Sequence, residues 1–92
     1  MGRVEGKIAI VTGAGTGIGR ACATRLAEEG ARLVLGDIEG EALAKTAADV
    51  TALDRPVHTV VGDLTDPAGA ESLIGTAIAE FGQIDCLVNN LG

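Results

Sequence analysis

Thr12-Gly13-Ala14-Gly15-Thr16-Gly17-Ile18-Gly19 is the stretch of this sequence that decides the fold. It follows a short, continuous apolar run at residues 8–11, which is typical of a strand buried on both faces. It leads into residues 17–29, whose helical spacing gives an apolar stripe of Ile18, Ala21, Cys22 and Leu26. Gly30 comes next, where a helix commonly ends. The stretch is therefore expected to be a glycine-rich turn between a buried strand and a helix.

The same alternation continues along the rest of the chain. The sequence predicts strands at residues 33–35, 57–61 and 84–88, and helices at residues 39–53 and 67–81. The second of these helices is expected to begin at Pro67 after an Asp66 N-cap and to end before Gly82. Strands separated by helices of this length pair in parallel through right-handed crossovers. We therefore expect an α/β fold, a partial doubly wound parallel sheet of the Rossmann type (β-α-β-α-β-α-β) with strand order 3-2-1-4. The ligand crevice of such a sheet lies outside the carboxyl ends of its first and fourth strands.

The glycine-rich turn is predicted to bind a diphosphate. A turn that opens a helix presents backbone N–H groups at a positive helix end, which binds an anion without help from Lys or Arg. Gly13 permits the tight turn, Gly17 lets the diphosphate approach the backbone, and Gly19 lets the helix pack close to the sheet. The spacing is Thr-Gly-x-x-x-Gly-x-Gly, and no Gly-Lys-Ser/Thr follows, which excludes the phosphate loop of nucleotide hydrolases.

An acidic residue ends the second predicted strand. Asp37 lies eighteen residues after Gly19, where an acid accepts hydrogen bonds from the adenosine ribose hydroxyls. A 2′-phosphate would be repelled by this carboxylate and would need a cation, whereas the next residue is Ile38. The pattern favours NAD over NADP. The competing interpretation is a solvated loop acid.

Further polar residues follow the third and fourth predicted strands. Asp63 is placed to accept from the adenine amino group while Leu64 lies against the ring, although a turn or helix-capping Asp is a competing interpretation. Asn90 is expected to bond both the cofactor and a neighbouring strand, with a simple turn asparagine as the alternative. The full predicted cofactor site consists of Gly13, Gly15, Thr16, Gly17, Ile18, Gly19, Asp37, Asp63, Leu64 and Asn90. We interpret His58 as structural and Arg20 as a surface residue.

Composition excludes several other classes of function. Seven Lys plus Arg against thirteen Asp plus Glu give a net charge of −6, and Phe81 is the only aromatic residue, so nucleic-acid binding is not expected. No apolar run is long enough to cross a bilayer. Cys22 and Cys86 form no Cys-x-x-Cys pair, so neither a metal nor a redox site is predicted. Without a recognisable signal peptide, the chain is expected to be cytoplasmic.

Together these motifs resemble the N-terminal half of a short-chain dehydrogenase/reductase over essentially all 92 residues. The matching features are residues 7–11, 12–19, Asp37, Asp63-Leu64, 81–85 and Asn89-Asn90-Leu91-Gly92. One departure is Leu91, where the family usually has Ala; the larger side chain either crowds the cofactor crevice or repacks it. The resemblance implies hydride transfer between a nicotinamide dinucleotide and a small alcohol or carbonyl substrate.

The resemblance also implies that the catalytic residues lie outside this stretch. The family uses a Tyr, a Lys four residues later and a Ser, whereas this sequence has no Tyr, and Lys7, Lys45 and Ser72 fall elsewhere. The family's catalytic residues follow the Asn-Asn-x-Gly motif, at which this sequence stops. Residues 1–92 would then form the N-terminal half of a single NAD(P)-binding Rossmann domain without its catalytic half. No residue here is assigned as catalytic.

Two functional hypotheses therefore stay open. One is the NAD-binding part of a dehydrogenase, inactive by itself and homo-oligomeric in its full-length form. The other is a non-catalytic nucleotide-binding or partner-binding module. A reading frame that continues past Gly92 into a Ser and a Tyr-x-x-x-Lys would favour the first. Because half of a doubly wound sheet leaves one face largely bare, we expect the isolated chain to be marginally stable and to bind NAD weakly.

Overall fold

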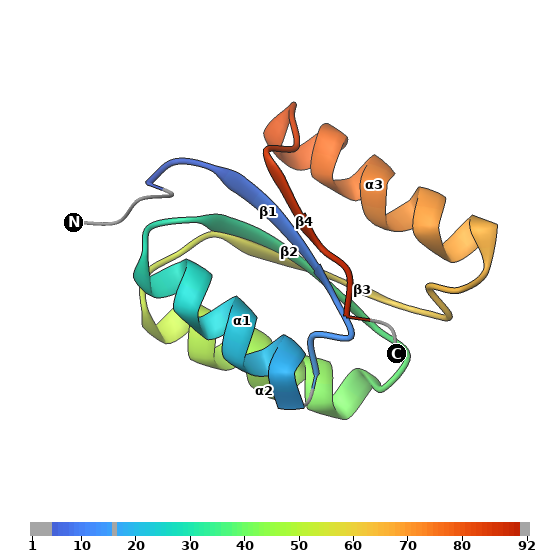
Figure 1. The fold of residues 1–92 in the computed structure, drawn as a ribbon, viewed down its shortest axis with the longest axis horizontal. Coiled ribbons are helices and arrows are strands. Elements are labelled where there is room, and N and C mark those ends of the chain that lie inside the picture. The colour runs from blue at the N-terminus through green and yellow to red at the C-terminus, as the bar shows by residue number, and fades with distance from the viewer. Residues whose placement is uncertain (1–4, 16, 91–92) are drawn as a thin grey trace.

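The computed structural model describes residues 5–15 and 17–90. In this part of the chain strands and helices alternate as the sequence predicts (Figure 1). The elements are β1 (Ile8–Thr12), α1 (Gly17–Glu28), β2 (Arg32–Asp37), α2 (Gly40–Ala52), β3 (Val57–Val61), α3 (Pro67–Phe81) and β4 (Cys86–Val88).

The strands form one parallel sheet with the order β3-β2-β1-β4, which confirms the predicted topology. Val11 in β1 is in register with Leu35 in β2 and with Val88 in β4. The chain reverses its direction of winding between β1 and β4, so their carboxyl ends flank the expected crevice.

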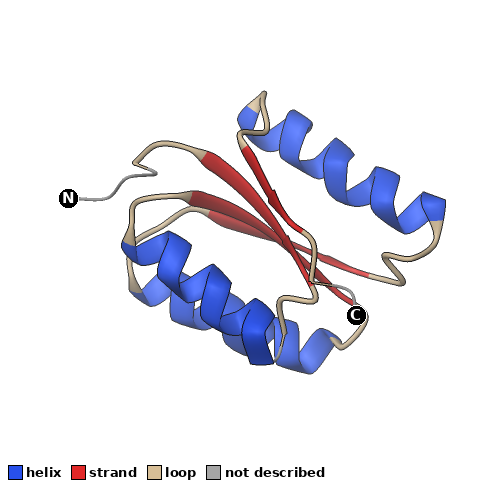
Figure 2. Ribbon diagram, in the orientation of Figure 1, coloured by secondary structure: helices blue, strands red, loops and turns tan. Residues whose placement is uncertain are grey.

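The sheet lies between two helical layers. Helices α1 and α2 cover one face and α3 covers the other (Figures 1 and 2). Alternate residues of β1 point to opposite faces: Ala9 and Val11 pack beneath α1 and α2, whereas Ile10 packs beneath α3. All five residues of β1 are buried, which explains why the strand reads as a continuous apolar run instead of an alternating one.

Helix α1 packs on the sheet mainly through small residues outside the predicted stripe, although Leu26 of that stripe is partly buried against the core. Its buried residues are Gly19, Ala23 and Ala27, whereas Ile18 is 71% exposed. Small side chains let the helix axis approach the sheet closely, so the larger residues stand beside the contact. They line a shallow apolar hollow of about 400 Å³, formed by Ile18, Ala21, Cys22, Arg25, Leu26 and Val88.

Helix α3 begins and ends at the predicted signals. The Asp66 carboxylate accepts a hydrogen bond from the Ala68 N–H at 3.0 Å, and Pro67 is the first helical residue. Gly82 ends the helix in the left-handed conformation, with a φ of 81°. None of the helices in the described ranges is both long and apolar enough to span a membrane.

Strand β4 is shorter than predicted because the chain enters it through a side-chain contact. Asp85 Oδ2 accepts from the Ile8 N–H at 2.9 Å, and the Asp85 N–H donates to the Ile8 carbonyl at 2.9 Å. Regular pairing with β1 then begins at Cys86.

Candidate functional site: the carboxyl ends of β1, β2 and β4

The glycine-rich turn joins β1 to α1 with two described glycines in the left-handed region. Gly13 has a φ of 60° and Gly17 a φ of 57°, values that a side chain makes unfavourable. A Cβ atom on Gly13 would lie 2.8 Å from the Asn90 carbonyl oxygen, whereas one on Gly17 would meet nothing within 4 Å. Gly13 is thus required by internal packing, and Gly17 borders open space at the start of α1. Thr16 lies outside the described residues.

Gly19 brings the first turn of α1 against the loop. A Cβ atom at this position would collide with the carbonyl oxygen of Gly13, and the Asn90 amide nitrogen would lie 3.0 Å away. Only a residue without a side chain fits here. The first turn of α1 is therefore packed directly on the loop that leaves β1.

Asp37 is joined directly to the glycine-rich turn. Its Oδ2 accepts from the Gly15 N–H at 2.7 Å, and its Oδ1 accepts from the Glu39 N–H at 3.0 Å. The side chain lies at the end of β2 and the residue is 8% exposed. An ionised carboxylate can accept about four hydrogen bonds, so two further donors can be accommodated. The carboxylate predicted to bind ribose thus also fixes the turn predicted to bind phosphate.

Thr12 ties the end of β1 to the residues after β4. Its Oγ1 accepts from the Asn90 N–H at 2.8 Å and lies 3.3 Å from the Val88 carbonyl oxygen and 3.1 Å from Asn89 Oδ1, to which its proton can be donated. Thr12 itself is 6% exposed. Asn90, half-buried, is thereby held beside Gly13 and Gly19. The sequence placed Thr12 in the motif without giving its side chain a role.

Thr46 is a site residue that the sequence analysis missed. It lies in α2, is fully buried, and donates its hydroxyl proton to the Ala14 carbonyl oxygen at 2.8 Å. The Ala14 N–H in turn donates to the Gly36 carbonyl at 3.1 Å. The sequence pattern that could have identified it is a polar residue with the helical spacing of the buried face of α2, between Leu43 and Val50.

Asp63 and Leu64 adopt different environments after β3. Asp63 is exposed, and its Oδ1 accepts from the hydroxyl and the N–H of Thr65. These hydrogen bonds lower the pKa of the Asp63 carboxyl below its usual value. Leu64 is 7% exposed and packs with Leu73 in the core beneath α3, so its side chain faces inward.

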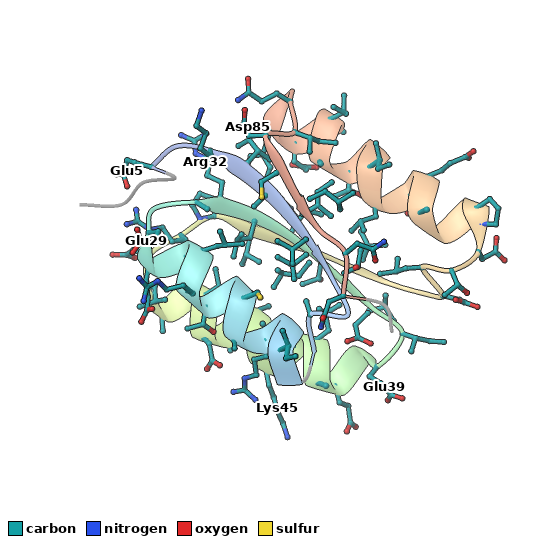
Figure 3. The ribbon with its side chains drawn as sticks, in the orientation of Figure 1. Glu5, Glu29, Arg32, Glu39, Lys45 and Asp85 are labelled. Atoms are coloured by element: carbon teal, nitrogen blue, oxygen red, sulfur yellow. The ribbon has the colours of Figure 1, made fainter. Side chains whose placement is uncertain are left out.

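The nearby cations are directed elsewhere. Arg20 is paired with Asp49 of α2 at 2.7 Å, in agreement with its interpretation as a surface residue. Lys45 points away from the sheet, as does Glu39 at the start of α2 (Figure 3). No group of three or more potential metal ligands occurs among residues 5–15 and 17–90. The described site therefore offers backbone N–H donors and one anchored carboxylate, groups that can bind the phosphate and hydroxyl groups of a nucleotide.

Comparison with known proteins agrees with this geometry. The family model described as short chain dehydrogenase matches residues 7–92. The chain is 48% identical over 84 residues to 1-deoxy-11-beta-hydroxypentalenate dehydrogenase of Streptomyces avermitilis, covering 91% of this chain and 31% of that protein. It is 46% identical over 90 residues to 1,6-dihydroxycyclohexa-2,4-diene-1-carboxylate dehydrogenase of Acinetobacter baylyi, covering 98% and 34%.

A solved structure shares the whole described architecture. The crystal structure of carveol dehydrogenase from Mycobacterium avium in complex with NAD superimposes with a TM-score of 0.94 and 38% sequence identity, covering 100% of this chain and 38% of that one. The chain thus spans about a third of the length of the relatives it matches. From the family match over nearly every residue and from these likenesses, we conclude that the chain belongs to the short-chain dehydrogenase family.

Proposed function

We propose that this chain is the NAD-binding part of a dehydrogenase that transfers hydride between a nicotinamide and an alcohol or carbonyl carbon. When bound, the nicotinamide supplies the hydride acceptor or donor. The observation that carries the proposal is the 2.7 Å hydrogen bond from the Gly15 N–H to Asp37. This bond joins a turn of the kind that binds phosphate to an acidic residue of the kind that binds ribose, so both belong to one site. The catalytic groups and the substrate site belong, in this proposal, to other parts of the protein.

The proposed diphosphate site is the turn from Gly13 to Gly19. Gly17 supports it, because the position that a Cβ would occupy borders open space beside the start of α1. The first N–H groups of a helix have no partner within the helix and carry its positive end, which stabilises an anion. Gly15, Thr16 and Ile18 complete the proposed lining of this turn.

The proposed ribose contact is Asp37. Its remaining acceptor capacity fits the two ribose hydroxyls of NAD, and its negative charge opposes a 2′-phosphate. Ile38, which is 63% exposed, brings no compensating cation beside it. We therefore propose NAD instead of NADP.

The proposed sites for the adenine and nicotinamide halves of NAD lie after β3 and β4. Because the Leu64 side chain faces the core, we propose that residues 63 and 64 contact adenine through the Asp63 side chain and the backbone. Asn90, held by Thr12, is proposed to contact the cofactor after β4. We further propose a cytoplasmic homo-oligomer; the two half-buried free thiols, Cys22 and Cys86, support a reducing compartment.

The substitution Asp37→Asn tests the cofactor assignment. We expect it to raise the Kd for NAD about 10-fold or more, since a charged hydrogen-bond acceptor is lost, while the Kd for NADP stays constant or falls. Calorimetric titration of the complete protein with both dinucleotides measures the ratio. Asp49→Asn is the matched control, because Asp49 pairs with Arg20 on the outer side of the helices and its loss should leave the ratio unchanged. An unchanged ratio in Asp37→Asn would refute the assignment.

A further inference from the structure

The hydroxyl of Thr46 is used differently from the other helical threonine hydroxyls in the described structure. Thr24, Thr51 and Thr76 each donate to the carbonyl oxygen four residues earlier, at 3.0, 2.9 and 2.8 Å. For Thr46 that oxygen, on Ala42, is 3.4 Å away. Its 2.8 Å contact leaves the helix and reaches the Ala14 carbonyl oxygen in the glycine-rich turn.

This contact completes the attachment of one peptide unit. The Ala14 carbonyl oxygen accepts from Thr46, and the N–H of the same peptide, that of Gly15, donates to Asp37. The Ala14 N–H donates to the Gly36 carbonyl oxygen at 3.1 Å. The turn is therefore fastened to β2 through two bonds and to α2 through Thr46.

Because Thr46 is buried, loss of its hydroxyl would leave its hydrogen-bond partner without that donor. Thr46 is 0% exposed, and no buried side-chain polar atom among the described residues lacks a partner. If the hydroxyl were replaced by a methyl group of similar size, the Ala14 carbonyl oxygen would lose its short donor within the protein interior. The peptide could then rotate and shift the N–H groups of the turn, while the Asp37 carboxylate stays held by the Glu39 N–H at 3.0 Å.

We propose that Thr46 is a positioning residue for the dinucleotide: its hydroxyl holds the glycine-rich turn in the conformation that receives the diphosphate. The inference rests on the proposed NAD-binding function and extends it to a residue of α2 that is separate from the turn itself. It assigns to α2 a role in binding, in addition to its packing through Leu43 and Val50.

The test compares four variants of the complete protein by calorimetric titration with NAD and with adenosine. Thr46→Val removes the hydroxyl at nearly constant volume, and Thr46→Ser restores it. Thr51→Val is the matched control, since it removes a hydroxyl from the same helix that bonds only to Ala47. Val50→Ala is the control for stability, because it weakens the core packing of α2 without removing a hydrogen bond to the turn.

We expect Thr46→Val to raise the Kd for NAD about 3- to 10-fold, with less than about a 2-fold change for adenosine, which has no phosphate. Thr46→Ser, Thr51→Val and Val50→Ala should bind NAD as the wild type does, even though Val50→Ala melts at a lower temperature. If Thr46→Val does not fold, Thr46→Cys takes its place, because a thiol is a weak donor and should give a Kd between those of the Ser variant and a non-donor.

Three results would overturn the inference. One is a Thr46→Val or Thr46→Cys variant that binds NAD as tightly as Thr46→Ser. Another is a Val50→Ala variant that weakens NAD binding as much as Thr46→Val, which would mean that Thr46 acts through stability alone. The third is a wild-type protein that fails to bind NAD, which would also refute the proposed function. Because this failure is seen without any substitution, it differs from a failure of the Thr46 inference alone.

Discussion

At the scale of single residues, the glycines of the turn divide into two kinds. Gly13 and Gly19 are close to neighbouring backbone, whereas Gly17, which is left-handed like Gly13, lies beside open space. The first kind serves the fold, and the second is the kind that leaves room for a ligand. Substitution by alanine should therefore separate the two roles.

We expect Gly19→Ala to prevent stable folding, because the new Cβ would collide with the Gly13 carbonyl oxygen. Gly17→Ala should cost only about 1 kcal/mol of folding free energy, from the positive φ, yet abolish measurable NAD binding by projecting into the diphosphate site. Urea unfolding and calorimetric titration measure the two effects. Normal NAD affinity in a folded Gly17→Ala variant would contradict the proposed location of the diphosphate.

Asp85 makes the stability of the sheet depend on pH. Hydrogen bonds from the Ile8 N–H and then from Gln83 lower the pKa of its carboxyl below 3.8. A lowered folded-state pKa stabilises the fold above the unfolded-state value, and this contribution disappears as the pH falls through the folded-state pKa. In urea unfolding between about pH 5 and pH 2, Asp85→Asn should therefore lose less stability than the wild type. An equal loss in both proteins would show that Asp85 carries no such linkage.

The candidate site residues that can be predicted from the sequence are those at the ends of consecutive strands and helices. Gly19 and Asp37 follow from the ends of consecutive elements, because parallel strands bring their carboxyl ends to one edge. Thr46 could not be assigned in this way. Its partner in the turn is 32 residues away, and only the packing of α2 decides whether a threonine turns its hydroxyl along the helix or out of it.

At the scale of elements, α3 shows how local signals set helix limits. Asp66, Pro67 and Gly82 determine both ends, and the helix begins and ends where the sequence predicts. Element order and strand order were also predicted correctly, since both follow from alternating periodicities and from crossover handedness. The contact face of α1 was predicted only in part: Leu26 packs against the core as expected, but the fully buried positions are Ala23 and Ala27, and Ile18 is exposed.

Removing the cap of α3 should have a measurable cost. Asp66→Ala deletes the acceptor for the Ala68 N–H, and we expect it to lower the free energy of unfolding by about 1 kcal/mol. Asp66→Asn should recover most of this loss, since its side-chain oxygen can still accept. Urea denaturation gives both values. Equal stability of the Ala variant and the wild type would mean that water replaces the cap at no cost.

At the scale of the whole molecule, one part of the exposed apolar surface lies beside β4 and along α3. Leu87 is 58% exposed in β4, and Ile74 and Ile78 in α3 are 47% and 49% exposed. Leu87, Ile74 and Leu64 also share the lining of a small hollow between these elements. Around β4, the hollow beside α1 continues this apolar surface on the other face of the sheet.

This surface determines how a polypeptide of residues 1–92 alone should behave. Pairing of β4 with β1 leaves the opposite edge of β4 without a strand in the described sheet, and an apolar edge of this kind promotes association. We expect the isolated polypeptide to form oligomers at micromolar concentration, as measured by light scattering. Leu87→Lys should reduce this association by placing a charge on the edge strand. Leu53→Lys, at a residue 37% exposed beyond the end of α2, is the control and should leave association unchanged. A monomer that unfolds in two states above about 50 °C would refute the expectation.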